Sequence, residues 1–270
     1  MTLVAPTNAP VWDPADYVAN SAAQHSWAQE LIAKLNLKGH ERILDVGCGD
    51  GRVTAQLAKA LSSGTATGVD SSEEMLRFAR AAFPASNHPN LRFVQQDARQ
   101  LDFDEPFDVL VSNAALHWVD DHPAFLRRAA HCLKAGGRLV ISCGGKGNAR
   151  DVFVALRKTI RLQRWRDYFR DLAAPYFFHS PEEYEQWLPA TGFEPRVVRL
   201  ANKDTCFHGP ANLTAWLRTT WLPYTQRVPA PQRDAFISDI VERYTARNPA
   251  DESARVTVRM VRLEIDAVRK

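Results

Sequence analysis

This sequence of 270 residues is poor in the features that mark specialised classes of protein. Its four cysteines form neither a C-x-x-C pair nor a metal-ligand spacing, which favours reduced thiols over a disulfide framework or a zinc site. No run of residues is apolar enough to span a bilayer, and the N-terminus lacks the basic and apolar regions of a signal peptide. The formal net charge is only +3 and the basic residues are scattered. We therefore expect a cytoplasmic monomer or homodimer that binds neither membrane nor nucleic acid.

What the chain does contain is an alternation of strand-like and helix-like segments. Hydrophobic residues make up 45% of the sequence, enough to bury a full core. Apolar runs that alternate with stretches of helical spacing predict an α/β fold with a doubly wound, mostly parallel sheet. We expect seven strands, of which the last is antiparallel, and a helical cap. The predicted strands cover residues 43–46, 65–70, 91–96, 107–113, 138–142, 194–204 and 256–265.

Residues 43–51 join the first predicted strand to a helix through three closely spaced glycines. Glycine permits positive φ and close approach of a ligand to the backbone, and a strand, glycine turn and helix open a nucleotide-binding βαβ unit. The spacing Gly47-x-Gly49-x-Gly51 is one residue shorter than the dinucleotide fingerprint, and Asp45 precedes the turn. A carboxylate there disfavours a phosphate and favours a cation. We therefore expect S-adenosylmethionine (SAM), which carries a sulfonium and an ammonium and no phosphate.

Residues at the ends of later strands complete the predicted SAM site. Asp70 ends the second strand nineteen residues after Gly51, a spacing suited to a carboxylate that accepts hydrogen bonds from a ribose diol. Ser71 follows at the start of a helix, and Met75 lies one turn into that helix, where it could cover the adenine. Asn113 ends the fourth strand, beside the first strand, at the point where doubly wound sheets bind their ligands.

Four motifs together resemble the class I SAM-dependent methyltransferases over residues 40–145. The resemblance implies that the side chain of Asp97 accepts from the adenine amino group and that the amide of Ala98 donates to a ring nitrogen. More narrowly, the last motif is similar to the trans-aconitate methyltransferase family and the related juvenile hormone acid methyltransferases, which esterify the carboxylate of a small organic acid. The motifs are Asp45-Val-Gly-Cys-Gly-Asp-Gly51, Val69-Asp70, Gln96-Asp97-Ala98 and Ser112-Asn-Ala-Ala-Leu-His-Trp118.

The N-terminal pattern Tyr17-x-x-Asn20-Ser21-x-x-Gln24 resembles the first helix of the juvenile hormone acid group. That resemblance implies that Gln24 reaches the substrate carboxylate, that Trp118 lines the pocket, and that Tyr17 lies near the substrate. It becomes weaker after residue 150, so the expected acceptor depends on less sequence than the expected cofactor.

We expect the chain to divide into four parts. Residues 1–36 form an arm and helix over the active site, and residues 37–206 form the SAM-binding core. Residues 207–254 form a helical cap, and residues 255–270 return to the core as its final strand. A cap inserted between the last two strands would lie over the strand ends, where a substrate pocket is expected.

Two aromatic and two basic residues are further substrate candidates. Trp221, Tyr224 and Arg227 are spaced three apart and would share one face of a helix, although such a stripe is more often part of a core. Arg227 or Lys146 could pair with an acidic substrate.

His117 separates two mechanisms. A carboxylate has a pKa of ~4 and is already ionised, so ester formation needs no general base. Transfer to an oxygen, nitrogen or carbon of another small metabolite, including an acyl chain on a carrier protein, would use a base, and His117 is placed to supply one. A third alternative is a SAM-binding protein without catalysis.

No metal is expected, because the acids after His117 are more typical of helix caps than of metal ligands.

Overall fold

The computed structural model describes the backbone of residues 22–270 and the side chains from Trp27 onward. The chain divides into two compact units. The sheet unit comprises residues 22–148, 176–203 and 261–270, and the described part of the helical unit comprises residues 149–175 and 204–260. The helical unit thus includes a segment, 149–175, that the sequence analysis placed in the core.

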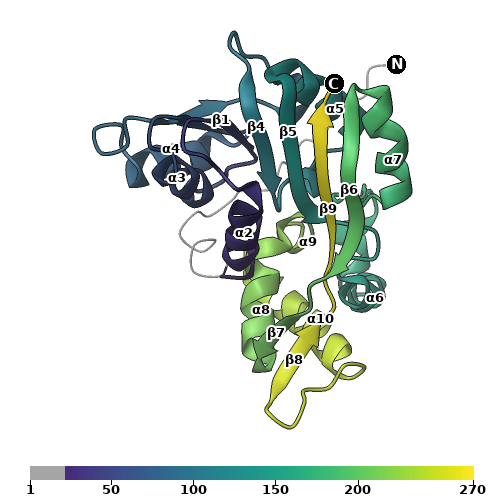
Figure 1. Cartoon of the computed structure of the whole chain (residues 1–270). Helices are drawn as coiled ribbons and strands as arrows, with labels where there is room; N and C mark the ends of the chain where they lie inside the picture. The colour runs from purple at the N-terminus through teal and green to yellow at the C-terminus, as the bar shows by residue number, and fades with distance from the viewer. Residues whose placement is uncertain (1–21) are drawn as a thin grey trace. The chain divides into compact units, whose positions relative to one another are not determined.

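A seven-stranded sheet forms the centre of the sheet unit, in the order β3-β2-β1-β4-β5-β9-β6 (Figure 1). The strands from β1 to β5 pair in parallel, and β9 pairs antiparallel with both β5 and β6. The predicted doubly wound sheet with an antiparallel last strand is confirmed. Its strands are β1 (Arg42–Val46), β2 (Thr65–Asp70), β3 (Leu91–Gln95), β4 (Phe107–Asn113), β5 (Leu133–Gly144), β6 (Phe193–Asn202) and β9 (Val261–Arg269).

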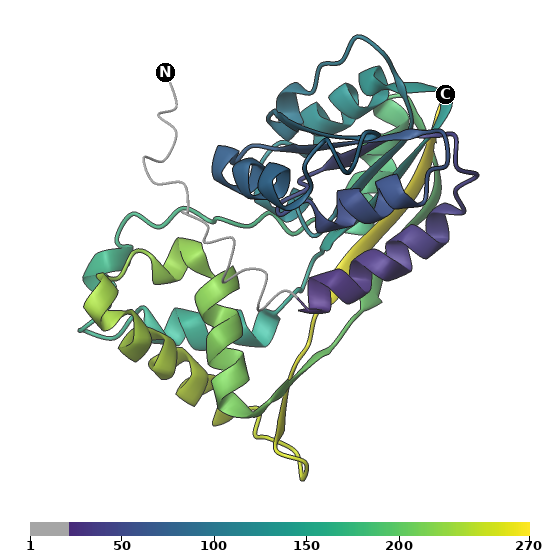
Figure 2. The same ribbon diagram turned by 90° about the vertical axis from the view of Figure 1, so that its left-hand side faces the viewer.

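Apolar side chains on both faces of the sheet explain why helices cover each face. Ile43 points to the face covered by α2 (Ala22–Leu35) and α3 (Arg52–Lys59), whereas its neighbour Leu44 points to the face covered by α5 (His122–Cys132) and α7 (Pro181–Ala190). Figure 2 shows α2, in purple, lying along its face of the sheet. The helix α4 (Glu73–Ala82) connects β2 to β3, and its N-cap Ser72 accepts from the Met75 amide.

The expected single strand over 255–270 is two strands in the structure. β8 (Arg255–Val258) pairs antiparallel with β7 (Thr205–His208), within the helical unit, and β9 begins three residues later, at Val261. The buried apolar positions are even-numbered from Val256 to Met260 and odd-numbered from Val261 onward. Because a strand alternates its faces with a period of two, this change of parity requires a break in the strand.

The helical unit has its own aromatic core. Phe236 stacks on Phe169 and meets Trp165 edge to face, and the buried carboxylate of Asp239 accepts from the Trp165 indole at 2.6 Å. Its helices are α6 (Arg150–Thr159), α8 (Gly209–Thr220), α9 (Leu222–Thr225) and α10 (Arg233–Thr245), with 3-10 turns η3 (Arg166–Phe169) and η4 (Ala230–Gln232). Over residues 22–270, no helix combines the length and the apolar character needed to cross a membrane.

Candidate functional site

The glycine turn after β1 is fastened to the end of β2. The amides of Gly47 and Cys48 both donate to the carbonyl oxygen of Val69, at 2.8 and 3.0 Å. Gly47, Gly49 and Gly51 all have positive φ, of 76°, 54° and 79°. These values fall in the left-handed region, which costs other residues energy. The predicted need for glycine in this turn is confirmed by its backbone conformation.

At Gly47 and Gly51 the turn also has no room for a side chain. A Cβ on Gly47 would lie 2.1 Å from the Cβ of Ala115, which follows β4, and a Cβ on Gly51 would lie 2.6 Å from the ring of Phe93 on β3. The turn is therefore packed tightly against the ends of its neighbouring strands. This arrangement leaves backbone, rather than side chains, at the carboxyl edge of the sheet.

Asp45 is buried immediately before the turn. It is 2% exposed, and one carboxylate oxygen accepts from the hydroxyl of Thr54 at 2.7 Å. Burial raises the pKa of Asp45 to about 7, the hydroxyl of Thr54 opposes that rise, and the nearby carboxylates of Asp70 and Asp50 add to it. A buried carboxyl group beside two other acids is ionised more readily when a cation binds next to it. The electrostatics of the turn therefore suit a positively charged ligand.

The carboxylate of Asp70 is oriented by the backbone on both sides. One oxygen accepts from the Gly49 amide and the other from the Ser72 amide, each at 2.9 Å. A carboxylate oxygen accepts more than one hydrogen bond, so both can still accept from a diol. Met75 is buried next to Gly49, with its methyl carbon 3.5 Å from where a Cβ would stand, whereas Ser71 is exposed. These positions are compatible with the predicted roles of Asp70 and Met75.

Asp97 lies at the start of η1 (Ala98–Gln100) and is paired with a neighbouring arginine. The guanidinium of Arg99 donates to both of its oxygens, at 2.9 and 2.6 Å, and also to Asp120 at 2.7 Å. Hydrogen bonds from Arg99 lower the pKa of Asp97. Arg99 thereby links the end of β3 to the segment after η2 (Leu116–Trp118), a connection that the sequence pattern did not indicate.

An aromatic cluster forms at the end of β4. His117 and Trp118 of η2 meet Tyr176 and Phe178, which lie in an extended segment before α7. The rings of Trp118 and Tyr176 are 4.7 Å apart, and Tyr176 stacks on Phe178 at 5.6 Å. The Phe177 amide donates to the carbonyl of His117 at 2.9 Å, which joins the two segments. Each of the four rings is half-buried, so the cluster forms a partly open aromatic wall.

His117 is held as a neutral imidazole. Its Nδ1 accepts a long hydrogen bond, 3.4 Å, from the Gly144 amide, which places the ring proton on Nε2. Burial lowers the pKa of His117 to about 3, and the positive charge of Arg262 adds to the shift. A group with so low a pKa is a poor proton acceptor near neutrality.

A buried chain of hydrogen bonds, from Tyr184 through His122 to the backbone of Leu116, holds η2 in place. The hydroxyl of Tyr184 lies 2.5 Å from Nδ1 of His122, and Nε2 of His122 lies 2.9 Å from the carbonyl oxygen of Leu116. Since a carbonyl only accepts, His122 carries its proton on Nε2 and accepts from Tyr184. His122 is fully buried, and burial lowers its pKa to about 4, so it stays neutral. These hydrogen bonds fix the backbone of η2, which carries His117 and Trp118.

Arg262 is the main site residue that sequence reasoning missed. It lies on β9 with 3% of its surface exposed, and it donates to the side chain of Asn113 at 3.1 Å and to the hydroxyl and carbonyl of Ser142. Its guanidinium also lies over the ring of Trp27, 4.6 Å from the centroid. The sequence does place Arg262 between two apolar residues of a predicted buried strand, and a buried arginine requires polar partners. No comparable pattern in the sequence indicates that Tyr176 and Phe178 belong to the site.

Three of the remaining substrate candidates belong to the helical unit. In the helical unit, Trp221 and Tyr224 are buried against Phe153, and the guanidinium of Arg227 donates to two backbone carbonyls, of Tyr168 and Asp171. A single helix would give these three residues one face, but α8 ends before Trp221 and a new helix, α9, begins at Leu222 with Pro223 in its first turn.

Three other predicted residues are not tested by these contacts. Lys146 is exposed in the loop after β5. Tyr17 lies outside the described residues, as does the side chain of Gln24. Within the described part of the chain, no three His, Cys, Asp or Glu side chains are grouped so as to hold a metal ion.

Comparison with known sequences gives consistent matches. The family described as "Methyltransferase domain" matches residues 43–137. A trans-aconitate 2-methyltransferase of Streptomyces avermitilis is 30% identical over 259 residues, which cover 93% of this chain and 94% of that protein. The enzyme of the same name from Streptomyces coelicolor is 33% identical over 258 residues, covering 91% and 82% respectively.

Solved structures share the fold at lower identity. A putative methyltransferase from Bacillus halodurans has a TM-score of 0.63 and 23% identity, and covers 90% of this chain and 98% of its own. A SAM-dependent methyltransferase from Geobacter sulfurreducens, in complex with S-adenosyl-L-homocysteine, has a TM-score of 0.58 and 16% identity, with coverage of 96% and 99%.

Proposed function

Because this chain belongs to the trans-aconitate 2-methyltransferase family of SAM-dependent methyltransferases, we propose that it methylates a carboxylate oxygen of a small organic acid, forming a methyl ester. The enzyme class and the cofactor follow from the family. The acceptor atom, the acid and the role of each residue are the proposal.

The glycine turn and its acids fit SAM. The ionised form of Asp45 balances the positive charge of the cofactor, and Asp70 accepts from the ribose hydroxyls. Side chains at Gly47 and Gly51 would fill the space against Ala115 and Phe93, so the turn keeps its backbone accessible. The other proposed cofactor contacts are Gly49, Ser71, Met75, Asp97, Ala98 and Asn113.

The observation that carries the choice of acceptor is the state of His117. Its Nδ1 accepts from the Gly144 amide and its pKa is about 3, so it is not suited to remove a proton from a phenol, an amine or a carbon acid. When bound, SAM supplies a methyl group on a sulfonium, and an ionised carboxylate accepts it without losing a proton. This disfavours the alternative in which His117 serves as a general base.

The residues around the acceptor then act by orientation and by removal of water. Trp118 and Gln24 donate hydrogen bonds to the carboxylate, and the rings of Tyr176 and Phe178 shield it from solvent. Orienting two reactants can supply roughly 7–11 kcal/mol of the barrier reduction. Uncharged donors align the carboxylate without binding it too strongly in the ground state.

The test is methyl transfer from labelled SAM to a panel of acids, with trans-aconitate, saturated di- and tricarboxylates, fatty acids, a phenol and an amine. The proposal expects label only in acids, in a product that mild alkali hydrolyses back to the acid. Label in the phenol or amine, in an alkali-stable product, would contradict it. Because Gln24 and Trp118 act on the acceptor, Gln24→Ala and Trp118→Phe should lower kcat while SAM affinity changes little.

A further inference from the structure

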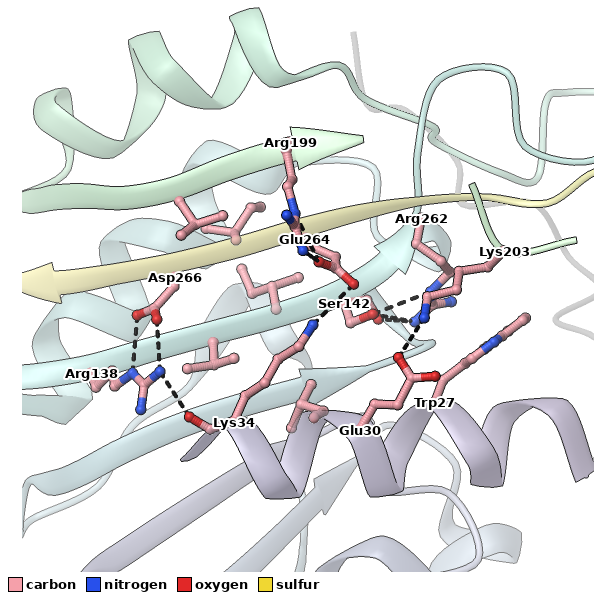
Figure 3. A pocket seen from close by; sticks show the side chains of 15 residues that line it. Trp27, Glu30, Lys34, Arg138, Ser142, Arg199, Lys203, Arg262, Glu264 and Asp266 are labelled. Atoms are coloured by element: carbon pink, nitrogen blue, oxygen red, sulfur yellow. Dashed lines mark hydrogen bonds and ion pairs between the residues drawn. The ribbon is translucent and has the colours of Figure 1, made fainter. Parts of the chain in front are cut away.

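Different polar contacts occur on the two faces of the sheet. On the face that α2 covers they include ion pairs, such as that of Lys34 on α2 with Glu264 on β9, at 3.2 Å (Figure 3). On the face that α5 and α7 cover, a hydrogen bond of 2.5 Å joins His122, at the start of α5, to Tyr184 of α7. Both of these side chains are fully buried, and a buried polar group lowers stability unless it has partners. The other partner of His122 therefore indicates what this hydrogen bond supports.

That partner is the carbonyl oxygen of Leu116. It accepts from Nε2 of His122 at 2.9 Å and from the Val119 amide, also at 2.9 Å, in the hydrogen bond that closes the 3-10 turn η2. A carbonyl oxygen has two lone pairs, so it accepts both hydrogen bonds at once. His122 therefore supports the backbone group that gives η2 its shape.

η2 is too short to be stable without contacts from the rest of the sheet unit. The hydrogen bonds of a 3-10 turn have poorer geometry than those of an α-helix, and a single turn is costly to nucleate. From outside the turn, the Phe177 amide donates to the carbonyl oxygen of His117 at 2.9 Å, and His122 donates to that of Leu116. Because Tyr184 orients His122, both contacts depend on the segment that leads into α7. That segment therefore holds η2 in position.

η2 connects the cofactor turn to the acceptor side of the proposed site. Ala115 precedes η2 and lies against the glycine turn, with its Cβ 2.1 Å from where a Cβ on Gly47 would stand. Trp118 ends η2 and is the proposed donor to the substrate carboxylate. A displacement of η2 would move the acceptor relative to the glycine turn, and a shift of about 1 Å between reacting groups can lower the rate about 100-fold. The hydrogen bond from His122 therefore acts on the segment that sets this distance.

We propose that His122 and Tyr184 are positioning residues for methyl transfer. Tyr184 donates to Nδ1 of His122 and so holds the imidazole in the tautomer that carries its proton on Nε2. His122 donates that proton to the Leu116 carbonyl, which keeps Trp118 in place. Both side chains are fully buried, so they act through η2 and not on a ligand. The proposal rests on the proposed role of Trp118 at the acceptor, but not on which atom of the acceptor is methylated.

Tyr184→Phe in the full chain removes one hydroxyl and leaves the ring in the core. The value of kcat at saturating SAM should fall about tenfold, because η2 is held less firmly, whereas the Kd for SAM should stay within about twofold. The matched control is Tyr244→Phe in the helical unit, where a tyrosine with 1% of its surface exposed donates to the carbonyl of Thr257 at 2.7 Å. Each variant loses one buried hydrogen bond and should lower Tm by about 2–5 °C, but only Tyr184→Phe should lower kcat.

Two substitutions of His122 distinguish its two hydrogen bonds. The amide of a glutamine reaches the place of Nε2 and can donate to the Leu116 carbonyl, whereas the amide of an asparagine reaches only the place of Nδ1, next to Tyr184. The proposal requires the hydrogen bond to Leu116, so kcat in His122→Gln should exceed kcat in His122→Asn by about tenfold. An equal or higher kcat in His122→Asn would overturn it.

Hydrogen exchange over residues 114–121 measures the order of η2 without turnover. The amides of Trp118 and Val119 donate within η2, so they should exchange faster in Tyr184→Phe and at the wild-type rate in Tyr244→Phe. Unchanged exchange or an unchanged kcat in Tyr184→Phe would contradict the proposal. Since kcat is measured on whichever compound of the panel takes up the label, label in a phenol or an amine would refute ester formation and leave this test intact.

Discussion

Burial raises the pKa of Asp45, whereas a positively charged ligand bound beside it would lower that pKa. Its pKa of about 7 in the cofactor-free protein should fall when the positively charged cofactor binds. SAM affinity should therefore rise about tenfold per pH unit from pH 5.5 to 7 and level off above. Asp45→Asn should bind more weakly at pH 7.5 and show no such rise, as measured by calorimetry.

Thr54 provides the matched control for this prediction. Its hydroxyl stabilises the ionised form of Asp45, so Thr54→Val should raise the pKa of Asp45 further and move the plateau to higher pH. If Asp45→Asn kept the pH dependence of the wild-type protein, another group would be responsible.

His117 should be required for its shape and hydrogen bond, not for proton transfer. With a pKa of about 3, it is uncharged throughout pH 6–8, so kcat at saturating SAM should be flat over that range. His117→Asn retains an acceptor for the Gly144 amide and should keep kcat within about tenfold, whereas His117→Ala should lose more. A kcat that rises steeply with pH and becomes flat in His117→Asn would instead identify a general base.

At the scale of the element, the turn between β1 and α3 depends on close packing more than on φ alone. Gly47 and Gly136 have nearly equal φ, 76° and 75°, but an added Cβ meets Ala115 at the first and nothing within 4 Å at the second. Both Gly→Ala changes should cost about 1–2 kcal/mol of stability for the left-handed conformation. Only Gly47→Ala should also weaken SAM binding, by tenfold or more in the same titration.

A second substitution, at Ala115, distinguishes the steric clash of the new Cβ from the backbone strain at residue 47. Ala115→Gly removes the methyl group that the new Cβ would meet, so the double variant Gly47→Ala/Ala115→Gly should recover part of the lost affinity. No recovery would mean that the conformation of the turn, and not its packing against β4, controls binding.

For the whole molecule, the proposed SAM contacts all lie in the sheet unit, so the cofactor should stabilise that unit. A ligand at 100 times its Kd adds about 2.7 kcal/mol to the free energy of unfolding. For a chain of this size, that corresponds to a rise in Tm of about 5–10 °C. Thermal unfolding with SAM should show this rise, and NAD at the same concentration should give none, because Asp45 disfavours a phosphate.

Local patterns were sufficient for much of the architecture. The parallel strands, the turn of Gly47, Gly49 and Gly51, and the acid of Asp70 could be predicted because periodicity and residue type near one another in sequence determine them. The break between β8 and β9 was also present in the sequence, as the change of parity at Val261, but the run of apolar residues concealed it.

The sequence alone determined the sheet, the glycine turn and the charge preference of the cofactor site, because each depends on residues within one strand, turn or helix. Only the tertiary structure decided that His117 is neutral, that Tyr176 and Phe178 join Trp118, and that Arg262 reaches Asn113. The contact of Trp118 with Tyr176 joins residues 58 positions apart, that of Arg262 with Asn113 joins residues 149 positions apart, and burial sets the pKa of His117. Such distances in sequence leave no local pattern, since the partners meet only when the sheet has formed.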